Sequence, residues 1–323
     1  MYHSNNLAKY RFLVTGGAGF IGSNLVRYLH EHNAGFIRVL DDLSGGHLHN
    51  IEPFMDSNRF EFIEGDIRDL ETCRKAVKDM DFVSHQAALG SVPRSIETPL
   101  LTNSVNITGF LNMLVASKDE GIRRFVYAAS SSTYGDSKKL PKVEDHIGKP
   151  LSPYAVTKLV NELYADVFYK IYGLETIGLR YFNVYGPNQD PNGAYAAVIP
   201  LFFKAALQGE PPTMNGDGLQ TRDFTYVDNA VQANLRSFFA DEKAINEVFN
   251  VAVGERINLL RLWDEISNLC DCSIEPAFGP ARRGDVRDSL ADVAKAERLI
   301  GYKNLVYLDE GLKKAHEYYT TIF

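Results

Sequence analysis

The first half of the sequence alternates short apolar, β-branched runs with longer stretches that have helical periodicity. The apolar runs predict buried strands at residues 11–15, 36–40, 60–64, 82–87 and 125–129. The stretches between them predict helices at residues 20–31, 71–78 and 101–120. Apolar strands that alternate with helices are typical of a parallel sheet covered on both faces. We therefore predict an α/β, doubly wound fold.

The composition of the sequence changes after Asn183, where a loop rich in Gly, Pro and Asn begins. Just before this point, a helix is expected at residues 154–172 and a strand at 176–182. Beyond it, helices are expected at residues 196–208, 259–269, 289–299 and 308–319, and a strand at 247–253. We predict two interleaved domains: residues 1–183 plus about 225–253 in the larger, and residues 184–224 and 254–323 in the smaller.

Charge and composition exclude several classes of protein. A net charge of −7 and a pI of about 5.7 argue against general binding to nucleic acid or to an anionic membrane. No apolar run is long enough to span a bilayer, and the first residues lack the pattern of a signal peptide, so a cytoplasmic location is expected. Cys73, Cys270 and Cys272 form neither a disulfide framework nor a zinc-ligand pattern, and no metal site is predicted.

A glycine-rich turn follows the first predicted strand, where Gly16, Gly19 and Gly22 form the pattern G-x-x-G-x-x-G. Glycines in such a turn let the backbone approach a pyrophosphate and let the next helix pack closely on the strand. Asp41 ends the second strand 19 residues after Gly22, the interval expected for an acid that binds ribose hydroxyls. Such a carboxylate repels a 2′-phosphate. The sequence therefore predicts a Rossmann-like domain that binds NAD rather than NADP.

Tyr154 and Lys158 stand four residues apart and share one face of a predicted helix. An ammonium group near a phenol favours the phenolate and lowers its pKa, so Tyr154 is a candidate general base for an alcohol. Ser130 and Ser131 follow a strand, at the edge where doubly wound sheets bind ligands, and either could relay a proton. By itself the Tyr–Lys spacing also fits a surface aromatic–cation pair. Because the pair follows a half of the chain that is predicted to bind a dinucleotide, we favour a catalytic role for it.

Several longer segments resemble the extended short-chain dehydrogenase/reductase superfamily, in its NAD-dependent epimerase/dehydratase family. They are residues 15–22, 85–88, 130–132, 180–187, 215–217, 222–224 and 282–287, together with Tyr154 and Lys158. Residues 86–95 and 190–200 further resemble the bacterial UDP-N-acetylglucosamine 4-epimerases of surface-polysaccharide pathways such as O-antigen synthesis. The resemblance covers nearly the whole chain.

The resemblance implies a role for each matching position. The residues expected to hold NAD are Gly16, Gly19, Phe20, Ile21, Gly22, Asp41, Asp42, Gly46, Asp66, Ile67, Gln86, Ala87, Ala88, Tyr154, Lys158, Tyr181 and Val184. Those expected to hold a UDP-sugar are Gly90, Ser91, Ser130, Ser131, Ser132, Tyr154, Asn183, Gln189, Ala197, Val198, Asn215, Arg222, Arg282, Asp285 and Ser289. The implied catalytic residues are Tyr154 as base, Lys158, and Ser130 or Ser131.

The implied activity is interconversion of UDP-N-acetylglucosamine and UDP-N-acetylgalactosamine through a 4-keto sugar. The corresponding uronic acids stay open, because Arg94 lies in a matching loop, and so do UDP-glucose and UDP-galactose. A UDP-glucuronate decarboxylase and a catalytically inactive NAD-sensing scaffold are further alternatives, and the intact Tyr–Lys pair argues against the scaffold. Related dehydratases carry an Asp–Glu pair where this chain has Ser131 and Ser132, which argues against water elimination.

The resemblance also implies a homodimer that pairs through the helices at residues 101–120 and 152–172. Both helices carry more apolar residues than packing on one sheet face needs, and these are Leu111, Leu114, Val115, Leu163 and Phe168. Small residues around the sugar would leave room for a ring that turns over during the reaction. The candidates for this role are Gly90, Ala197 and Ser289.

Overall fold

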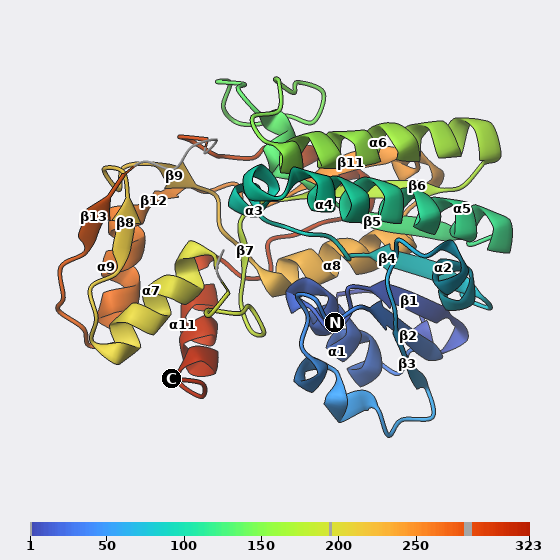
Figure 1. Cartoon of the computed structure of the whole chain (residues 1–323), viewed down its shortest axis with the longest axis horizontal. Coiled ribbons are helices and arrows are strands. Elements are labelled where there is room, and N and C mark those ends of the chain that lie inside the picture. The colour runs from blue at the N-terminus through green and yellow to red at the C-terminus, as the bar shows by residue number, and fades with distance from the viewer. Residues whose placement is uncertain (1, 194–195, 281–285) are drawn as a thin grey trace.

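The computed structural model describes residues 2–193, 196–280 and 286–323, and a parallel sheet of seven strands lies at its centre (Figure 1). The strands run in the order β11-β6-β5-β4-β1-β2-β3. Their bounds are β1 Arg11–Thr15, β2 Phe36–Asp41, β3 Phe60–Glu64, β4 Phe82–His85, β5 Arg124–Ser130, β6 Thr176–Tyr181 and β11 Glu247–Val251. The chain builds outward from β1 in one direction and then from β4 in the other. The predicted Rossmann-like, doubly wound fold is therefore confirmed.

Helices cover both faces of this sheet, as Figure 1 shows. Their bounds are α1 Phe20–Glu31, α2 Leu70–Val77, α3 Val92–Glu97, α4 Pro99–Asn103, α5 Phe110–Glu120, α6 Pro153–Tyr172, α7 Val198–Gln208, α8 Val227–Phe238, α9 Leu259–Leu269, α10 Ala294–Ile300 and α11 Leu308–Tyr319. Phe12 and Val14 of β1 pack with α1, α8 and α10, whereas Leu13 packs with α2, α5 and α6 on the opposite face. Because β1 is buried on both sides, it reads as a continuous apolar run.

A third apolar core lies outside the sheet and is built by α7, α9 and α11. Phe202 of α7 packs edge-on against Trp263 of α9, and Phe203 stacks on Tyr319 of α11. Short strand pairs border this core: β7 Val184–Tyr185 with β10 Thr225–Tyr226, β8 Thr213–Asn215 with β13 Ala277–Gly279, and β9 Thr221–Arg222 with β12 Ile257–Asn258. The predicted domain boundaries stay a prediction.

One predicted helix is interrupted. Residues 101–120 contain the end of α4, then a π-helical segment, Ser104–Gly109, and only then α5. Within the π-helical segment, the buried Asn106 accepts a hydrogen bond from Leu89 N at 2.8 Å and donates one to Thr157 Oγ1 at 3.1 Å. This wider turn therefore fixes the loop after β4 against α6, and such π-segments are common near functional sites.

The helix predicted at residues 289–299 begins later, at Ala294. The preceding residues are held in an extended strip, because Ser289 N donates to Thr221 O at 3.1 Å and Asp292 N donates to Lys142 O at 2.9 Å. Backbone hydrogen bonds to two neighbouring segments prevent the strip from coiling. The consequence is that Ser289 is fixed beside β9, close to the open edge of the sheet.

Asp223 ties the large sheet to the smaller region. Its buried carboxyl group accepts hydrogen bonds from the backbone N–H groups of Val253, Gly254 and Ala291 at 3.0–3.1 Å. Its carbonyl oxygen accepts from Asn183 Nδ2 at 3.0 Å. The carboxyl group therefore joins the end of β9 to the end of β11 and to the strip before α10, and the carbonyl oxygen adds the residue that follows the end of β6.

Exposed apolar side chains gather on α4 and α6. Leu163 is 59% exposed and Ile171 is 67% exposed, and the group also contains Leu100, Leu101, Val156, Val167 and Tyr172. Two residues expected on this surface lie elsewhere, because Leu114 and Phe168 point toward the sheet and are buried in its core. The predicted homodimer stays a prediction. Among the described residues, no helix is long and apolar enough to cross a membrane.

If this apolar surface forms a dimer, Leu163→Lys should convert the dimer to a monomer at micromolar concentration, because a buried lysine would face an apolar partner. Light scattering gives the mass. Leu219→Lys is the control, since Leu219 is similarly exposed but lies outside α4 and α6. A monomeric wild-type protein, or equal effects of the two substitutions, would contradict the prediction.

Candidate active site

A cavity of about 550 Å³ opens at the carboxyl ends of the parallel strands. At this edge the connections that follow β1 and β4 lead toward opposite sides of the sheet, and this is the usual ligand position in open α/β sheets. The cavity brings together most of the predicted site residues. They are Gly16, Gly19, Phe20, Ile21, Gly22, Asp41, Asp42, Gly46, Ile67, Gln86, Ala87, Ala88, Gly90, Ser130, Ser131, Ser132, Tyr154, Lys158, Tyr181, Asn183, Val184, Gln189, Arg222 and Ser289.

Three predicted substrate residues line a second cavity of about 220 Å³. They are Ala197, which precedes α7, Val198 on α7 and Asn215 on β8. The two cavities share lining residues Asn183, Val184 and Arg222. A ligand that passes Arg222 can therefore reach from the sheet edge into the smaller region.

Two further predicted site residues, Asp66 and Ser91, are not among those that line either cavity. Asp66 forms a salt bridge with Arg68, which lowers the pKa of its carboxyl group. The Ser91 hydroxyl accepts a hydrogen bond from Arg94 N at 3.1 Å and caps α3. Arg282 and Asp285 lie outside the described residues.

The glycine-rich turn depends on close backbone approach. Gly16 has a φ of +66°, and a Cβ atom there would lie 2.7 Å from Ala87 N, so no other residue fits without a shift. Gly19 precedes α1 and offers no side-chain cap, which leaves the N-terminus of the helix facing the cavity. Backbone N–H groups at such an end bind phosphate. The turn thus fits a dinucleotide pyrophosphate.

Asp41 also has a structural role in the glycine-rich turn, which the sequence does not predict. Its buried carboxylate accepts a hydrogen bond from Ala18 N at 2.9 Å and another from Leu43 N at 2.9 Å. Burial raises the pKa of Asp41, and these backbone donors lower it. The residue therefore holds the glycine-rich turn in place and also lines the cavity. A negative charge at this end fits the ribose hydroxyls of NAD.

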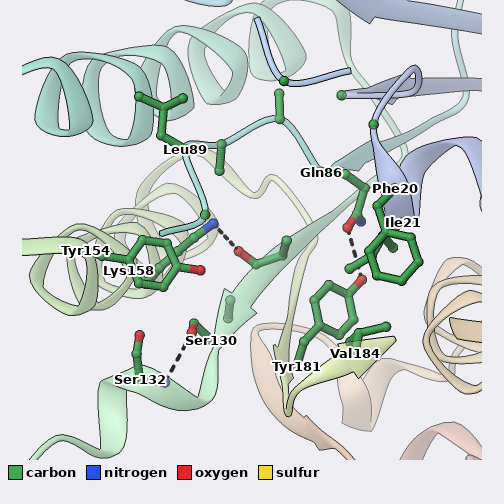
Figure 2. Close-up of a pocket in the computed structure, with 18 of the residues that line it drawn as sticks. Phe20, Ile21, Gln86, Leu89, Ser130, Ser132, Tyr154, Lys158, Tyr181 and Val184 are labelled. Atoms are coloured by element: carbon green, nitrogen blue, oxygen red, sulfur yellow. Dashed lines mark hydrogen bonds between the residues drawn. The ribbon is translucent and has the colours of Figure 1, made fainter. Parts of the chain in front are cut away.

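The candidate catalytic side chains come from α6 and from the end of β5, as Figure 2 shows. Tyr154 lies on the first turn of α6, which begins after Ser152, and the Ser152 hydroxyl caps the helix by accepting from Ala155 N at 3.2 Å. Lys158 is 2% exposed, and its ammonium donates to Ala128 O at 2.7 Å. Ser130 lies beside Tyr154, and its hydroxyl accepts from Ser132 N at 3.1 Å.

The pKa of Tyr154 differs from the expectation. Burial raises it, and the hydroxyl of Ser130 lowers it in part. Lys158 does not produce the expected lowering in the protein alone, because its ammonium is held by Ala128 O and lies 6.0 Å from the centre of the Tyr154 ring. Burial also lowers the pKa of Lys158, to about 8. Among the described residues, the effect of burial on the pKa of Tyr154 therefore outweighs that of the Ser130 hydroxyl.

Sequence reasoning missed some lining residues, and Lys142 is the main one. It lies in the loop before α6, is 3% exposed, lines the large cavity and donates from Nζ to Ser137 O. Burial lowers its pKa. No spacing or repeat distinguishes this lysine in the sequence, so only the fold reveals its position. Arg94, which the sequence offers as a carboxylate ligand, also lines the cavity.

The sheet, the glycine-rich turn, the acid after β2 and the Tyr–Lys pair together define an α/β enzyme that uses a dinucleotide. The profile of the NAD dependent epimerase/dehydratase family matches residues 12–252. The chain belongs to this family, and NAD, the cofactor that the sequence predicts, is confirmed as its cofactor. The glycine-rich turn and Asp41 fit that cofactor.

Individual relatives are similar over nearly their whole length. A putative UDP-glucose 4-epimerase of Methanocaldococcus jannaschii is 39% identical over 304 residues, which cover 94% of this chain and 96% of the relative. A solved UDP-glucose 4-epimerase from Thermotoga maritima with UDP-glucose has a TM-score of 0.91 and 37% identity, covering 97% and 99% of the two chains. A UDP-N-acetylglucosamine 4-epimerase from Methanobrevibacter ruminantium, in complex with UDP-N-acetylmuramic acid, has a TM-score of 0.91 and 38% identity, with the same coverage.

Lys158→Met should reveal the cost of the buried ammonium. The folded pKa is about 8 and the ordinary value is 10.5, so between these values the unfolded chain binds a proton that the folded chain does not. The free energy of unfolding of the wild type, relative to Lys158→Met, should therefore rise with pH across this window, by roughly 3 kcal/mol. Urea titrations of both nucleotide-free proteins measure the difference, and a flat or falling difference would contradict it.

Proposed function

We propose that this protein is an NAD-dependent UDP-sugar 4-epimerase, and that its preferred pair is UDP-N-acetylglucosamine and UDP-N-acetylgalactosamine. The coarser part, 4-epimerisation of a UDP-sugar, is supported by the family match and by relatives that carry this activity in their names. Those names include both glucose and N-acetylglucosamine enzymes. The choice of sugar therefore has to be argued from the cavity.

The observation that carries the reaction type is the distribution of charge in the large cavity. Among the described residues that line it, the carboxylates are Asp41, which ends β2, and Asp42, which follows it, both at the nucleotide end. Hydroxyl groups of Ser130, Ser131 and Tyr154 line the other end. Elimination of water needs an acid and a base beside the sugar, whereas oxidation and reduction at one carbon need only a proton carrier. The cavity favours epimerisation over dehydration.

The chain's own residues would move one proton and hold the substrate. When bound, NAD supplies an acceptor and donor of hydride for C4 of the sugar. Tyr154 would take the proton of the 4-hydroxyl group, directly or through Ser130, and return it when the 4-keto sugar is reduced from its other face. Arg222, which lines both cavities, would hold the diphosphate so that the hexose can turn about that fixed point.

Unpartnered polar atoms support a polar ligand at the sugar end. Among the described residues, the buried atoms Ser132 Oγ and Gln189 Oε1 have no hydrogen-bond partner, and both residues line the large cavity. Buried polar atoms are normally paired, so a hydroxyl-rich ligand is a reasonable partner. Both residues are among those that the resemblance assigns to the UDP-sugar.

Room around the sugar supports the acetamido substrate. Ser289 is small, lines the cavity and is fixed by its backbone bond to Thr221, so it cannot move to fill the space. A Cβ atom on Gly90 would meet nothing within 4 Å. Ala197 lies in the second cavity and contributes no room at the catalytic serines. A 2-acetamido group therefore fits beside Ser289 as the ring turns over.

A second candidate, a sugar uronic acid, is favoured by one observation. Arg94 and Lys142 both line the large cavity, and either cation could pair with a carboxylate at C6. The deciding experiment is to supply UDP-N-acetylglucosamine, its uronic acid, UDP-glucose and UDP-glucuronate, and to separate the products. Faster epimerisation of UDP-N-acetylglucosamine is expected. Release of CO₂ would identify a decarboxylase, and no turnover of any sugar would favour the scaffold alternative.

Tyr154→Phe should lower kcat by about 10²–10⁴-fold, because it removes the proton carrier while the ring keeps its packing. NAD should stay bound, since the ring and Lys158 are unchanged. Kinetics with the preferred sugar, together with the absorbance of bound nucleotide, measure both effects. A variant with near-wild-type kcat would reject Tyr154 as the base.

Ser289→Tyr should slow the acetamido sugars and spare UDP-glucose, because the larger side chain takes the space beside the 2-position. The change in the ratio of kcat/KM values should be about 10–200-fold, the scale of steric discrimination in a pocket. Competing UDP-glucose and UDP-N-acetylglucosamine in one reaction gives the ratio directly. Equal loss of both activities would show that Ser289 does not set the choice.

A further inference from the structure

Four polar side chains form a closed circuit of hydrogen bonds behind the wall of the large cavity. Gln86 Nε2 donates to Ser84 Oγ at 2.9 Å and to Asn234 Oδ1 at 3.1 Å, and Ser84 Oγ donates to the same Asn234 oxygen at 2.9 Å. Asn234 Nδ2 donates to the Tyr181 hydroxyl at 2.7 Å, and that hydroxyl donates to Gln86 Oε1 at 3.2 Å. Figure 2 shows the Tyr181–Gln86 contact at the cavity.

The direction of every bond in this circuit follows from one backbone atom. Asn234 Nδ2 also lies 2.9 Å from Ala230 O, one turn earlier on α8. A carbonyl oxygen can only accept, so the amide nitrogen of Asn234 must face it, and Oδ1 must face Ser84 and Gln86. Gln86 must then present its nitrogen to Asn234 and its oxygen to Tyr181. The Tyr181 hydroxyl is left with one arrangement, in which it accepts from Asn234 and donates to Gln86.

The circuit crosses the sheet from β4 to β6, beside the part of the cavity that is expected to hold NAD. Ser84 lies on β4, Tyr181 ends β6, β5 lies between these two strands, and Asn234 comes from α8. Gln86 and Tyr181 line the cavity, whereas Ser84 and Asn234 are fully buried. Asn234 therefore links two lining residues that no backbone hydrogen bond joins directly.

Two tyrosines that line the cavity, Tyr154 and Tyr181, differ in the hydrogen bonds of their hydroxyl groups. The Tyr181 hydroxyl uses its hydrogen on Gln86 and accepts from Asn234, and burial raises its pKa to about 12. Tyr154 has a hydroxyl contact with Ser130, and among the described residues no side-chain amide is recorded as a partner of its hydroxyl. The Tyr181 side chain therefore only lines the cavity, and Tyr154 is the phenol available for proton transfer.

We propose that Asn234 is a positioning residue for the NAD site, which acts through Tyr181 and Gln86 by fixing their side chains against the bound cofactor. Networks in which every polar group is satisfied are rigid, and loss of one member leaves the others to reorient. Loss of Asn234 would free the Tyr181 hydroxyl and the Gln86 amide, and the wall would then have several arrangements. Holding NAD in one of them would cost conformational freedom, so NAD would leave faster.

Asn229 provides a matched control on the same helix. It is also fully buried, donates to Val306 O at 2.8 Å, and accepts from Leu305 N at 2.9 Å and from Val306 N at 3.2 Å. These partners lie before α11 and not at the cavity. Asn229→Ala therefore removes a comparable set of buried hydrogen bonds without touching Tyr181 or Gln86, and thermal unfolding should show similar destabilisation by both substitutions.

The test uses the NAD-loaded protein and measures the rate at which bound NAD exchanges with excess labelled NAD. Asn234→Ala should raise the exchange rate about tenfold, the scale of a lost hydrogen bond, and Asn229→Ala should change it less than about twofold. Tyr181→Phe breaks the same circuit without leaving a space on α8, and it should give a similar increase. This variant keeps the test valid if Asn234→Ala does not fold.

The double variant Tyr181→Phe/Asn234→Ala isolates the route of action. If Asn234 acts through the Tyr181 hydroxyl, the double variant should exchange NAD no faster than the faster single variant. Multiplying effects, or equal exchange rates for Asn234→Ala and Asn229→Ala, would overturn the proposal. The readout involves NAD alone and no sugar, so it can fail while the proposed epimerase activity stands.

Discussion

The site exists because Gly16 lies directly against the backbone of the loop after β4. A Cβ atom at Gly16 would lie 2.7 Å from Ala87 N and 2.9 Å from the carbonyl carbon of Gln86. This contact brings the glycine-rich turn after β1 beside residues 86–88, at the point in the sheet where the strand order reverses. Asp41 then fixes the same turn from the other side, through Ala18 N. Both ends of a dinucleotide are thereby given rigid neighbours.

The polar groups in and around the cavity are of two kinds, one held in place by hydrogen bonds within the protein and one able to bond to a ligand. Fixed groups, such as Asp41 and the circuit of Ser84, Gln86, Tyr181 and Asn234, are held in place by hydrogen bonds within the protein. Reactive groups keep some hydrogen-bonding capacity for a ligand. Tyr154 contacts Ser130, and Ser132 Oγ has no hydrogen-bond partner among the described residues. A site that must oxidise and reduce one carbon without losing the sugar needs this contrast, because rigid walls position the reactants while only one phenol moves a proton.

The strands were predictable because burial on both faces makes them continuous apolar runs, and β1 and β3 have the expected bounds. Helix α8 was missed because Asn229, Gln232 and Asn234 are polar yet buried, which hides its apolar face. Long-range bonds explain two further differences: Asn106 holds the π-helical segment, and Lys142 and Thr221 hold the strip before α10. The spacing of Tyr154 and Lys158 located the reactive pair but not the effect of burial on the pKa of Tyr154.

The central claim is that the sugar is oxidised and reduced at C4 within one closed site, with Tyr154 as the proton carrier. The most direct test uses UDP-N-acetylglucosamine that carries deuterium on C4, and mass spectrometry of both epimers after equilibration in ordinary water. The account predicts that deuterium is retained at C4 in both epimers and that free NADH does not accumulate. Loss of the label to water, or stoichiometric release of NADH with an oxidised sugar, would contradict it.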